Sequence, residues 1–199
     1  MRSLVIETAT AACSVALIEG VSLIDERHEV VGRGHAERLL PLVEDLLGGR
    51  KPDSILVDLG PGSFTGVRVG LAAAQGLRIG WGVPLHGYSS TSILAVQAGR
   101  EAAIAIAGGH GQLFVQSFAH EPFAPLDHLR SLPPDEAAAV IRAELILGSG
   151  AAALVAARGS GEARDALPRA ADARFLPEAL KSLPPRPIYG RAPDAKPMP

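Results

Sequence analysis

The chain has 199 residues, of which 47% are hydrophobic and 4% aromatic, so its length allows one large domain or two lobes with an aliphatic core. Its 19 basic and 21 acidic residues give a net charge of −2 without any basic run, which argues against a stand-alone nucleic-acid-binding protein. A single cysteine excludes an internal disulfide, and no apolar run approaches membrane length. We therefore expect a cytoplasmic protein that does not contact membranes.

Apolar segments and turn signals predict a first lobe over residues 1–100. Three strands at the start predict an antiparallel meander, and helical spacing follows. In chain order the predicted elements are strands at 3–8, 14–18 and 21–27, a helix at 36–47, a strand at 54–58, a helix at 63–79, a strand at 84–87 and a helix at 90–98. This β-β-β-α-β-α-β-α order is that of a ribonuclease-H-like lobe.

The second half, residues 101–183, predicts fewer elements and therefore a reduced second lobe. Its predicted elements are strands at 102–107, 112–118 and 145–147 and short helices at 135–142 and 151–158. Six of the 16 prolines fall between Ser182 and Pro199, so we expect the tail, residues 184–199, to be extended rather than packed. The fold class is therefore α/β, with a full first lobe and a reduced second one.

The segment from Asp58 to Leu77 carries the most distinctive pattern in the chain. It reads DLGPGSFTGVRVGLAAAQGL: a strand enters a Gly-Pro-Gly turn, and a helix without a carboxylate follows, with Ser63 as the expected cap. Small residues recur every four positions on two faces of this helix, Gly66, Gly70 and Ala74 on one and Ala72, Gly76 and Gly80 on the other. Because each glycine costs a helix about 1 kcal/mol relative to alanine, we expect close packing, within the chain or against a partner.

Known phosphate-binding and nucleophile motifs do not fit this turn. A P-loop needs a lysine and a hydroxyl residue after its last glycine, whereas Val67 and Arg68 follow Gly66. The glycine spacing is one residue too wide for a dinucleotide-binding fingerprint, and Ser63 lacks the flanking glycines of a nucleophile elbow. We predict no catalytic residue here.

Two carboxylates end neighbouring predicted strands. Glu7 and Asp58 could together hold Mg²⁺ through water, although a solvated carboxylate at each strand end is the simpler interpretation. The six histidines form no HxxH, HxxxH or HExxH pair, so we predict no metal site.

Hydroxyl groups at the first hairpin allow two interpretations. Thr8, Thr10 and Ser14 could form a phosphate grip, but hydroxyls in a tight hairpin more often bond the local backbone, which we favour.

Arg68 lies in the first turn of a helix, where the dipole favours anions. We therefore expect it to pair with a carboxylate, either Glu44 or Asp45 or one on another chain.

Several blocks of the sequence, in the right order, resemble the TsaB (YeaZ) family. They cover most of the first hundred residues and the tail: LVIETATAACSVAL, GHAERLLPLVEDLL, DLGPGSFTGVRVGLAAAQGL, VPLHGYSSTSILA and IYGRAPDAKP. The sequence departs from the family where Glu7 replaces a common aspartate and where a Gly-Gly-His-Gly turn at 108–111 replaces an Asp-Ala-Arg-like turn. Residues 120–180 are too divergent to map.

The resemblance implies an actin-like, ribonuclease-H-like fold of two lobes. It also implies a non-catalytic scaffold that pairs with a TsaD-type transferase in threonylcarbamoyl modification of the tRNA adenosine next to the anticodon, together with a TsaE-type ATPase. It further implies that tRNA is met only through the complex and that no cofactor is required. Weak nucleotide binding and a homodimer of the isolated chain are allowed.

Under this interpretation, the helices at 36–47 and 63–79 form the partner interface, where small residues permit close approach and leucine and valine supply apolar area. The predicted interface residues are Leu39, Leu40, Val43, Phe64, Gly66, Arg68, Val69, Gly70 and Ala73. The alternative is a nucleotide-dependent small-molecule kinase of the same fold, which would need two full lobes with phosphate loops in both. Direct tRNA binding would need a basic stripe that the sequence lacks.

Overall fold

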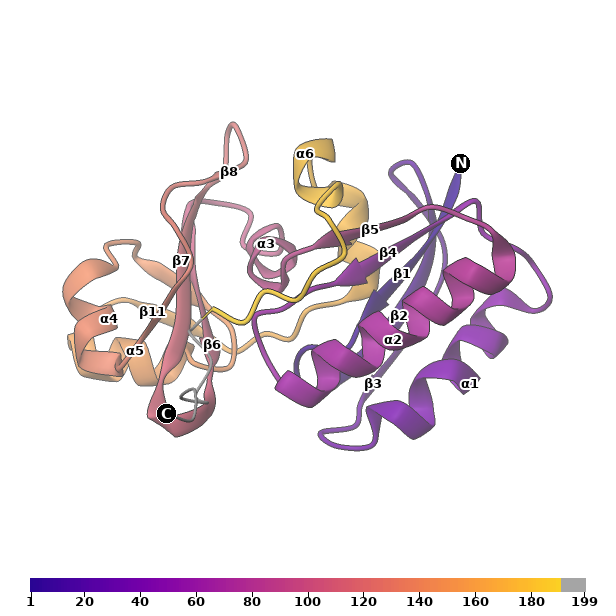
Figure 1. The fold of residues 1–199 in the computed structure, drawn as a ribbon. Helices are drawn as coiled ribbons and strands as arrows, with labels where there is room; N and C mark the ends of the chain where they lie inside the picture. Colours follow the sequence, from indigo (N-terminus) through magenta and orange to yellow (C-terminus); the bar gives the residue numbers. More distant parts are fainter. Residues whose placement is uncertain (191–199) are drawn as a thin grey trace, which may run out of the picture.

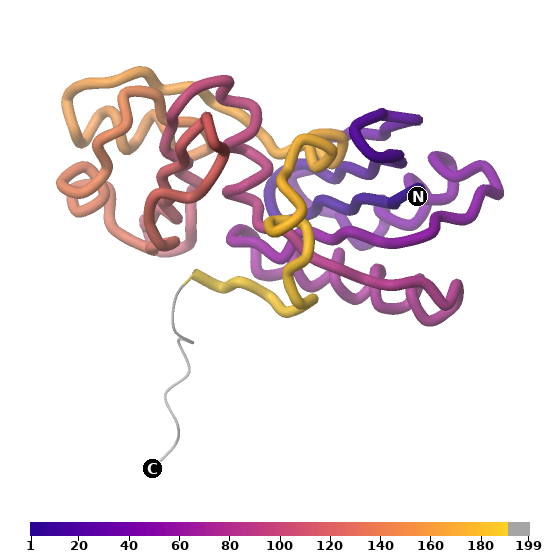
Figure 2. The backbone as a smooth tube through the Cα atoms, turned by 90° about the horizontal axis from the view of Figure 1, so that it is seen from above, coloured from indigo at the N-terminus to yellow at the C-terminus, as the bar shows by residue number. Residues whose placement is uncertain are grey.

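The computed structural model describes residues 1–190 and shows two α/β lobes side by side (Figures 1 and 2). A five-stranded sheet of order β3-β2-β1-β4-β5 forms the first lobe. The first-lobe elements are β1 (Arg2–Glu7), β2 (Ala12–Glu19), β3 (Ser22–Val30), α1 (His35–Leu47), β4 (Ser54–Asp58), α2 (Phe64–Trp81), β5 (Leu85–Tyr88) and α3 (Ser90–Ala95). The predicted element order is confirmed, and the strand at 54–58 has the predicted bounds.

The second lobe is built on a six-stranded sheet of order β11-β10-β6-β7-β8, with β9 also paired to β7. Three of its elements match the prediction: β6 (Ala102–Ala107), β10 (Leu145–Leu147) and α5 (Ala151–Arg158). The others are η1 (Gly109–Gly111), β7 (Leu113–Ala119), β8 (Ala124–Pro125), β9 (Arg130–Leu132), α4 (Pro134–Val140), β11 (Glu162–Arg164), η2 (Ala170–Phe175) and α6 (Glu178–Lys181). The prediction missed β8, β9, β11, η2 and α6, each of which is short or lacks a periodic pattern.

Central strand β1 of the first sheet divides its side chains between two cores, because successive residues of a strand point to opposite faces. Leu4 and Ile6 pack in the core beneath α1 and α2, and Figure 1 shows both helices on the same side of the sheet. Val5 packs in the opposite core with α3 and with Ala170 and Ala171 of η2. Both faces of β1 and β2 are therefore buried.

The last part of the described chain returns to the first lobe. Elements η2 and α6, within residues 101–183 that were assigned to the second lobe, pack on the first sheet and near β5. Leu183 then forms an antiparallel bridge with Gly87 of β5, and Ile188 donates its N–H to the carbonyl of Leu59 at 2.7 Å. Figure 2 shows this yellow segment running from the first lobe toward the second. Residues 191–199, which include most of the closing block of the family resemblance, lie outside the described part.

Helix α2 begins as predicted, with the Ser63 hydroxyl accepting the Gly66 N–H at 3.2 Å, and ends at Gly82 in the left-handed conformation. Its Gly66–Gly70 face is turned toward β1. A Cβ added at either glycine would lie closer than 3.0 Å to Thr8, to its carbonyl oxygen at Gly66 and to its hydroxyl at Gly70. This small-residue face therefore packs inside the chain, and its assignment to a partner interface is wrong.

No helix within residues 1–190 is long and apolar enough to cross a membrane.

Candidate functional site

A cleft of about 820 Å³ opens between the two lobes. The β1–β2 hairpin, the start of α2 and the C-terminal segment line it from the first-lobe side, and the loops after β6 and β10 line it from the other. Its lining is mostly apolar, as ligand clefts usually are. The polar and aromatic side chains of its lining include Thr10, Ser63, Phe64, Arg68, Ser149 and Tyr189.

The two carboxylates at the ends of β1 and β4 lie inside the protein rather than in solvent. Parallel pairing of β1 with β4 brings Glu7 and Asp58 together, and their exposed fractions are 0% and 1%. Burial, with Asp58 beside it, raises the pKa of Glu7 well above its ordinary value, and burial also raises the pKa of Asp58. Both side chains are buried, so the prediction of solvated carboxylates is wrong.

Neighbouring donors satisfy this carboxyl pair. Glu7 accepts the Ala9 N–H at 3.0 Å, and the Tyr88 hydroxyl lies 3.3 Å from its other oxygen. Asp58 accepts from the Ser90 hydroxyl at 2.7 Å and from the Gly60 N–H at 2.9 Å. Water-mediated Mg²⁺ binding would need access to solvent that these side chains lack. In residues 1–190, no group of three or more His, Cys, Asp or Glu side chains is arranged to hold a metal ion.

The hydroxyl groups of the first hairpin form hydrogen bonds within the protein. Thr8 is 1% exposed and donates to the Gly66 carbonyl at 2.8 Å, and Ser14 is fully buried and accepts the Ala170 N–H at 3.0 Å. Thr10 accepts the Ala12 N–H at 3.3 Å and is the one member of the three that lines the cleft. A phosphate grip built from all three is therefore wrong. The favoured interpretation, bonding to the local backbone, holds for Thr10 but is wrong for Thr8 and Ser14, because their partners lie on distant segments.

The predicted interface residues divide between core and surface. Leu39 and Val43 are buried at 1% and 3% exposure in the core beneath α1, so they offer no area to a partner and their assignment is wrong. Leu40 and Phe64 are 51% and 55% exposed. Arg68 is exposed, and Val69 and Ala73 are half-buried.

Arg68 does not pair with Glu44 or Asp45. Asp45 instead binds Arg27, which also pairs with Asp25 at 2.6 Å. The Arg68 guanidinium lies 3.3 Å from the ring centroid of Phe64, and it donates to the Tyr189 hydroxyl at 3.2 Å. The prediction of Glu44 or Asp45 as the partner of Arg68 is therefore wrong.

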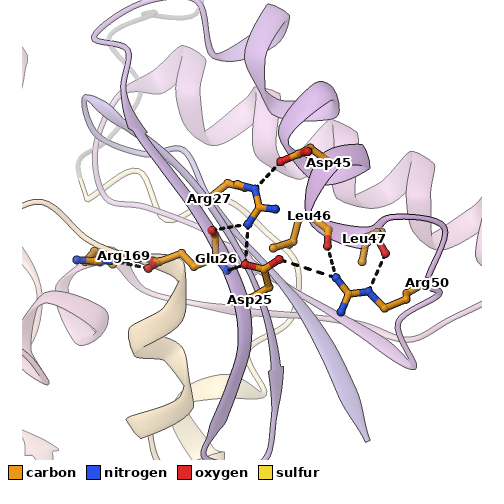
Figure 3. A network of polar contacts seen from close by, with 8 residues as sticks. All are labelled: Asp25, Glu26, Arg27, Asp45, Leu46, Leu47, Arg50 and Arg169. Carbon is orange, nitrogen blue, oxygen red and sulfur yellow. Dashed lines mark hydrogen bonds and ion pairs between the residues drawn. The ribbon is translucent and has the colours of Figure 1, made fainter.

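A polar network that the sequence analysis missed connects three elements around β3 (Figure 3). Asp25 and Arg27 of β3 reach α1 and Arg50, which also donates to the carbonyls of Leu46 and Leu47. Glu26, on the same strand, pairs with Arg169 just before η2. The signal was the charged run at 25–29, but which partners it meets depends on long-range contacts.

Comparisons with known proteins relate this chain to the threonylcarbamoyl-modification proteins of tRNA. The family model "TsaD: tRNA N6-adenosine threonylcarbamoyltransferase" matches residues 27–130, half of the chain. The Escherichia coli "tRNA threonylcarbamoyladenosine biosynthesis protein TsaB" is 42% identical over 106 residues, which cover 51% of this chain and 46% of that protein. An uncharacterised protein of Mycobacterium tuberculosis is 29% identical over 98% of this chain and 94% of its own length. The chain spans about half the length of the first curated TsaB relatives it matches.

Solved structures extend the similarity to the whole fold. YeaZ from Pseudomonas aeruginosa has a TM-score of 0.81 at 28% identity, covering 95% of this chain and 100% of that one. A second solved structure, described as similar to peptidase YeaZ from Pseudomonas aeruginosa, has a TM-score of 0.80 at 30% identity, covering 96% and 99%. These matches confirm the predicted actin-like, ribonuclease-H-like class. With a family model over half of its residues and the YeaZ fold over nearly all of them, this chain belongs to the TsaB (YeaZ) family.

Proposed function

We propose that this chain is a non-catalytic scaffold subunit that pairs with a TsaD-type transferase in threonylcarbamoyl modification of the tRNA adenosine next to the anticodon. Its TsaB relatives are named for the biosynthesis of that modified nucleoside. A TsaE-type ATPase is the proposed third component, and tRNA is met only through the complex. The kinase alternative is not favoured by these relatives.

The observation that carries the proposal is the outward face of α1 and α2. On α1, Glu37 and Glu44 are exposed, and on α2, Arg78 is exposed. None of the three makes an ion pair with another residue in the described range 1–190. A partner helix pair packed in the opposite sense would place its basic helix on α1 and its acidic helix beside Arg78, which favours a specific orientation.

Small residues leave room for that close approach. Ala72, Gly76 and Gly80 lie on the exposed side of α2, and a Cβ added at either glycine meets nothing within 4 Å. Leu40 and Ile79, 51% and 79% exposed, supply apolar area beside them. The proposed interface therefore keeps the two predicted helices but uses the opposite face of α2.

The same face would also form the contact between two copies of the chain. A second copy presents the same opposite charges, so the isolated chain is expected to dimerise through this face at high concentration.

No cofactor is required for the scaffold role. Any nucleotide is expected to bind only weakly, because Thr8 and Ser14 are buried in structural hydrogen bonds.

Gly76→Leu should weaken binding of the partner without lowering the stability of the fold. Because the position is open, Gly76→Leu should leave the melting temperature unchanged or higher, while its side chain holds the partner helix away and weakens binding by about ten-fold or more. Titration calorimetry against the TsaD-type transferase of the same organism measures the affinity.

The matched control is Ala156→Leu, an exposed alanine on α5 of the other lobe, which should bind normally. Equal affinity of the two variants would remove this face of α2 from the interface. A wild-type chain that does not bind the transferase, or that modifies tRNA without it, would overturn the proposed function itself.

A further inference from the structure

We propose that the mouth of the cleft between the lobes is a second anchor point for the partner protein, where Arg68 pairs with a carboxylate on an acidic segment that packs against Phe64 and Tyr189. This inference rests on the proposed function and deepens it, because it names the chemistry of the partner and adds the C-terminal segment to the binding surface.

Phe64, Arg68 and Tyr189 form one preassembled stack. The two rings have centroids 5.6 Å apart at 32°, and the Arg68 guanidinium lies 3.3 Å from the Phe64 centroid and 5.6 Å from that of Tyr189. Phe64 is 55% and Tyr189 40% exposed. Aromatic residues and arginine are the types most enriched at binding hot spots. Stacking also holds the guanidinium in place, and one of its N–H groups donates to the Tyr189 hydroxyl, so its remaining N–H groups can meet a carboxylate.

Tyr189 is held by the fold on both sides of the cleft. One residue before it, the Ile188 N–H donates to the Leu59 carbonyl in the first lobe. One residue after it, Gly190 fits so closely against the second lobe that an added Cβ would lie 2.8 Å from the ring of Phe114. Because the anchor is already ordered, little conformational entropy is lost on binding.

Among residues 1–190, the side chains that line the cleft offer hydrogen-bond donors and no carboxylate. Thr10, Ser63 and Ser149 each accept a hydrogen bond from a backbone N–H, of Ala12, Gly66 and Ala107 respectively. Their hydroxyl hydrogens are therefore free to donate into the cleft. Arg68 adds the positive charge, and it has no carboxylate partner in the described part of the chain. Such a surface selects an acceptor-rich, negatively charged ligand.

The position of Phe64 and Arg68 on α2 favours a protein segment over a small anion as the ligand of this site. Phe64 and Arg68 lie at the start of α2, on the helix whose exposed positions at Ala72 and Gly76 continue the proposed partner face. A partner packed along α2 would reach the cleft mouth without a break in the contact surface. An acidic segment at that end of the partner would then meet the only unpaired cation that lines the cleft among residues 1–190.

The test uses the full chain and the intact transferase. Arg68→Gln should weaken binding by about ten-fold or more and should reduce the loss of affinity between 50 and 500 mM NaCl, because the lost contact is ionic. Tyr189→Ala should weaken binding by about five-fold or more, whereas Tyr189→Phe, which keeps the ring, should stay within about two-fold. The control is Arg142→Gln, an exposed arginine of the second lobe without an ion pair among the described residues, which should bind normally.

Melting temperatures within about 2 °C of wild type show that the variants are folded. Unchanged affinity of Arg68→Gln, or affinity of Tyr189→Ala equal to wild type, would overturn the inference while leaving the α1–α2 interface intact. Binding of AMP by the isolated chain that is lost in Arg68→Gln, with normal transferase affinity, would assign the site to a small anion instead. Failure of the wild-type chain to bind the transferase would overturn the proposed function, and this inference with it.

Discussion

Gly66→Ala is expected to lower the free energy of unfolding by about 3 kcal/mol or more, at the upper end of the range for single substitutions. The new Cβ would lie closer than 3.0 Å to the carbonyl oxygen of Thr8. Relief would require β1 and α2 to move apart, which would also break the 2.8 Å hydrogen bond from the Thr8 hydroxyl to the Gly66 carbonyl. Urea denaturation followed by circular dichroism measures the change.

Gly76→Ala is the matched control, since it makes the same chemical change ten residues later in the same helix. Nothing lies within 4 Å of the added Cβ there. The free energy of unfolding of this variant should therefore be higher than that of the wild type by about 1 kcal/mol, because alanine has the higher helix propensity. If the two variants had equal stability, the Gly66 face of α2 would not be packed against β1.

Raising the pH should destabilise the protein through Glu7, and Glu7→Gln should remove much of that loss. The folded state raises the pKa of Glu7 well above its ordinary value of 4.5, chiefly because of burial and then because of Asp58. From about pH 4.5 upward the folded state therefore holds a proton that the unfolded state has released. Stability falls as pH rises through this window, by about 1.4 kcal/mol for each unit by which the folded pKa is raised.

At pH 5 the variant and the wild type should differ by only about 1 kcal/mol, because one neutral hydrogen-bonding group replaces another. Between pH 5 and pH 9 the difference should shift in favour of Glu7→Gln. Urea denaturation at four pH values across this range measures it. A constant difference would show that Glu7 is ionised in the folded protein.

Glu29→Gln is the control, because the folded state shifts the pKa of Glu29 downward, opposite to the shift of Glu7. The hydrogen bonds from Arg38 lower the pKa of Glu29, so its contribution is present above the ordinary pKa of a glutamate and is lost as the pH falls through the lowered value. Its effect should therefore stay constant between pH 5 and pH 9. A slope like that of Glu7→Gln would point to a general effect of charge.

Local sequence was sufficient where a segment carries its own signal. An uninterrupted apolar run predicted the strand at 54–58, and a serine before a helical pattern predicted the cap at Ser63. The order of these elements, together with several matching sequence blocks, was enough for the fold class and the family. Such signals are readable because strand periodicity, caps and turns depend on residues near one another in the chain.

Only the tertiary structure decided what covers each face. Periodicity placed Gly66 and Gly76 on different sides of α2, but both sides carry small residues, so it could not show which one packs against β1. The pairing of β1 with β4 buried Glu7 against Asp58, and the returning C-terminal segment placed Tyr189 on Arg68 across 121 positions of sequence. Burial and stacking arise from residues far apart in the chain, and a local pattern holds no information about which distant segment will arrive.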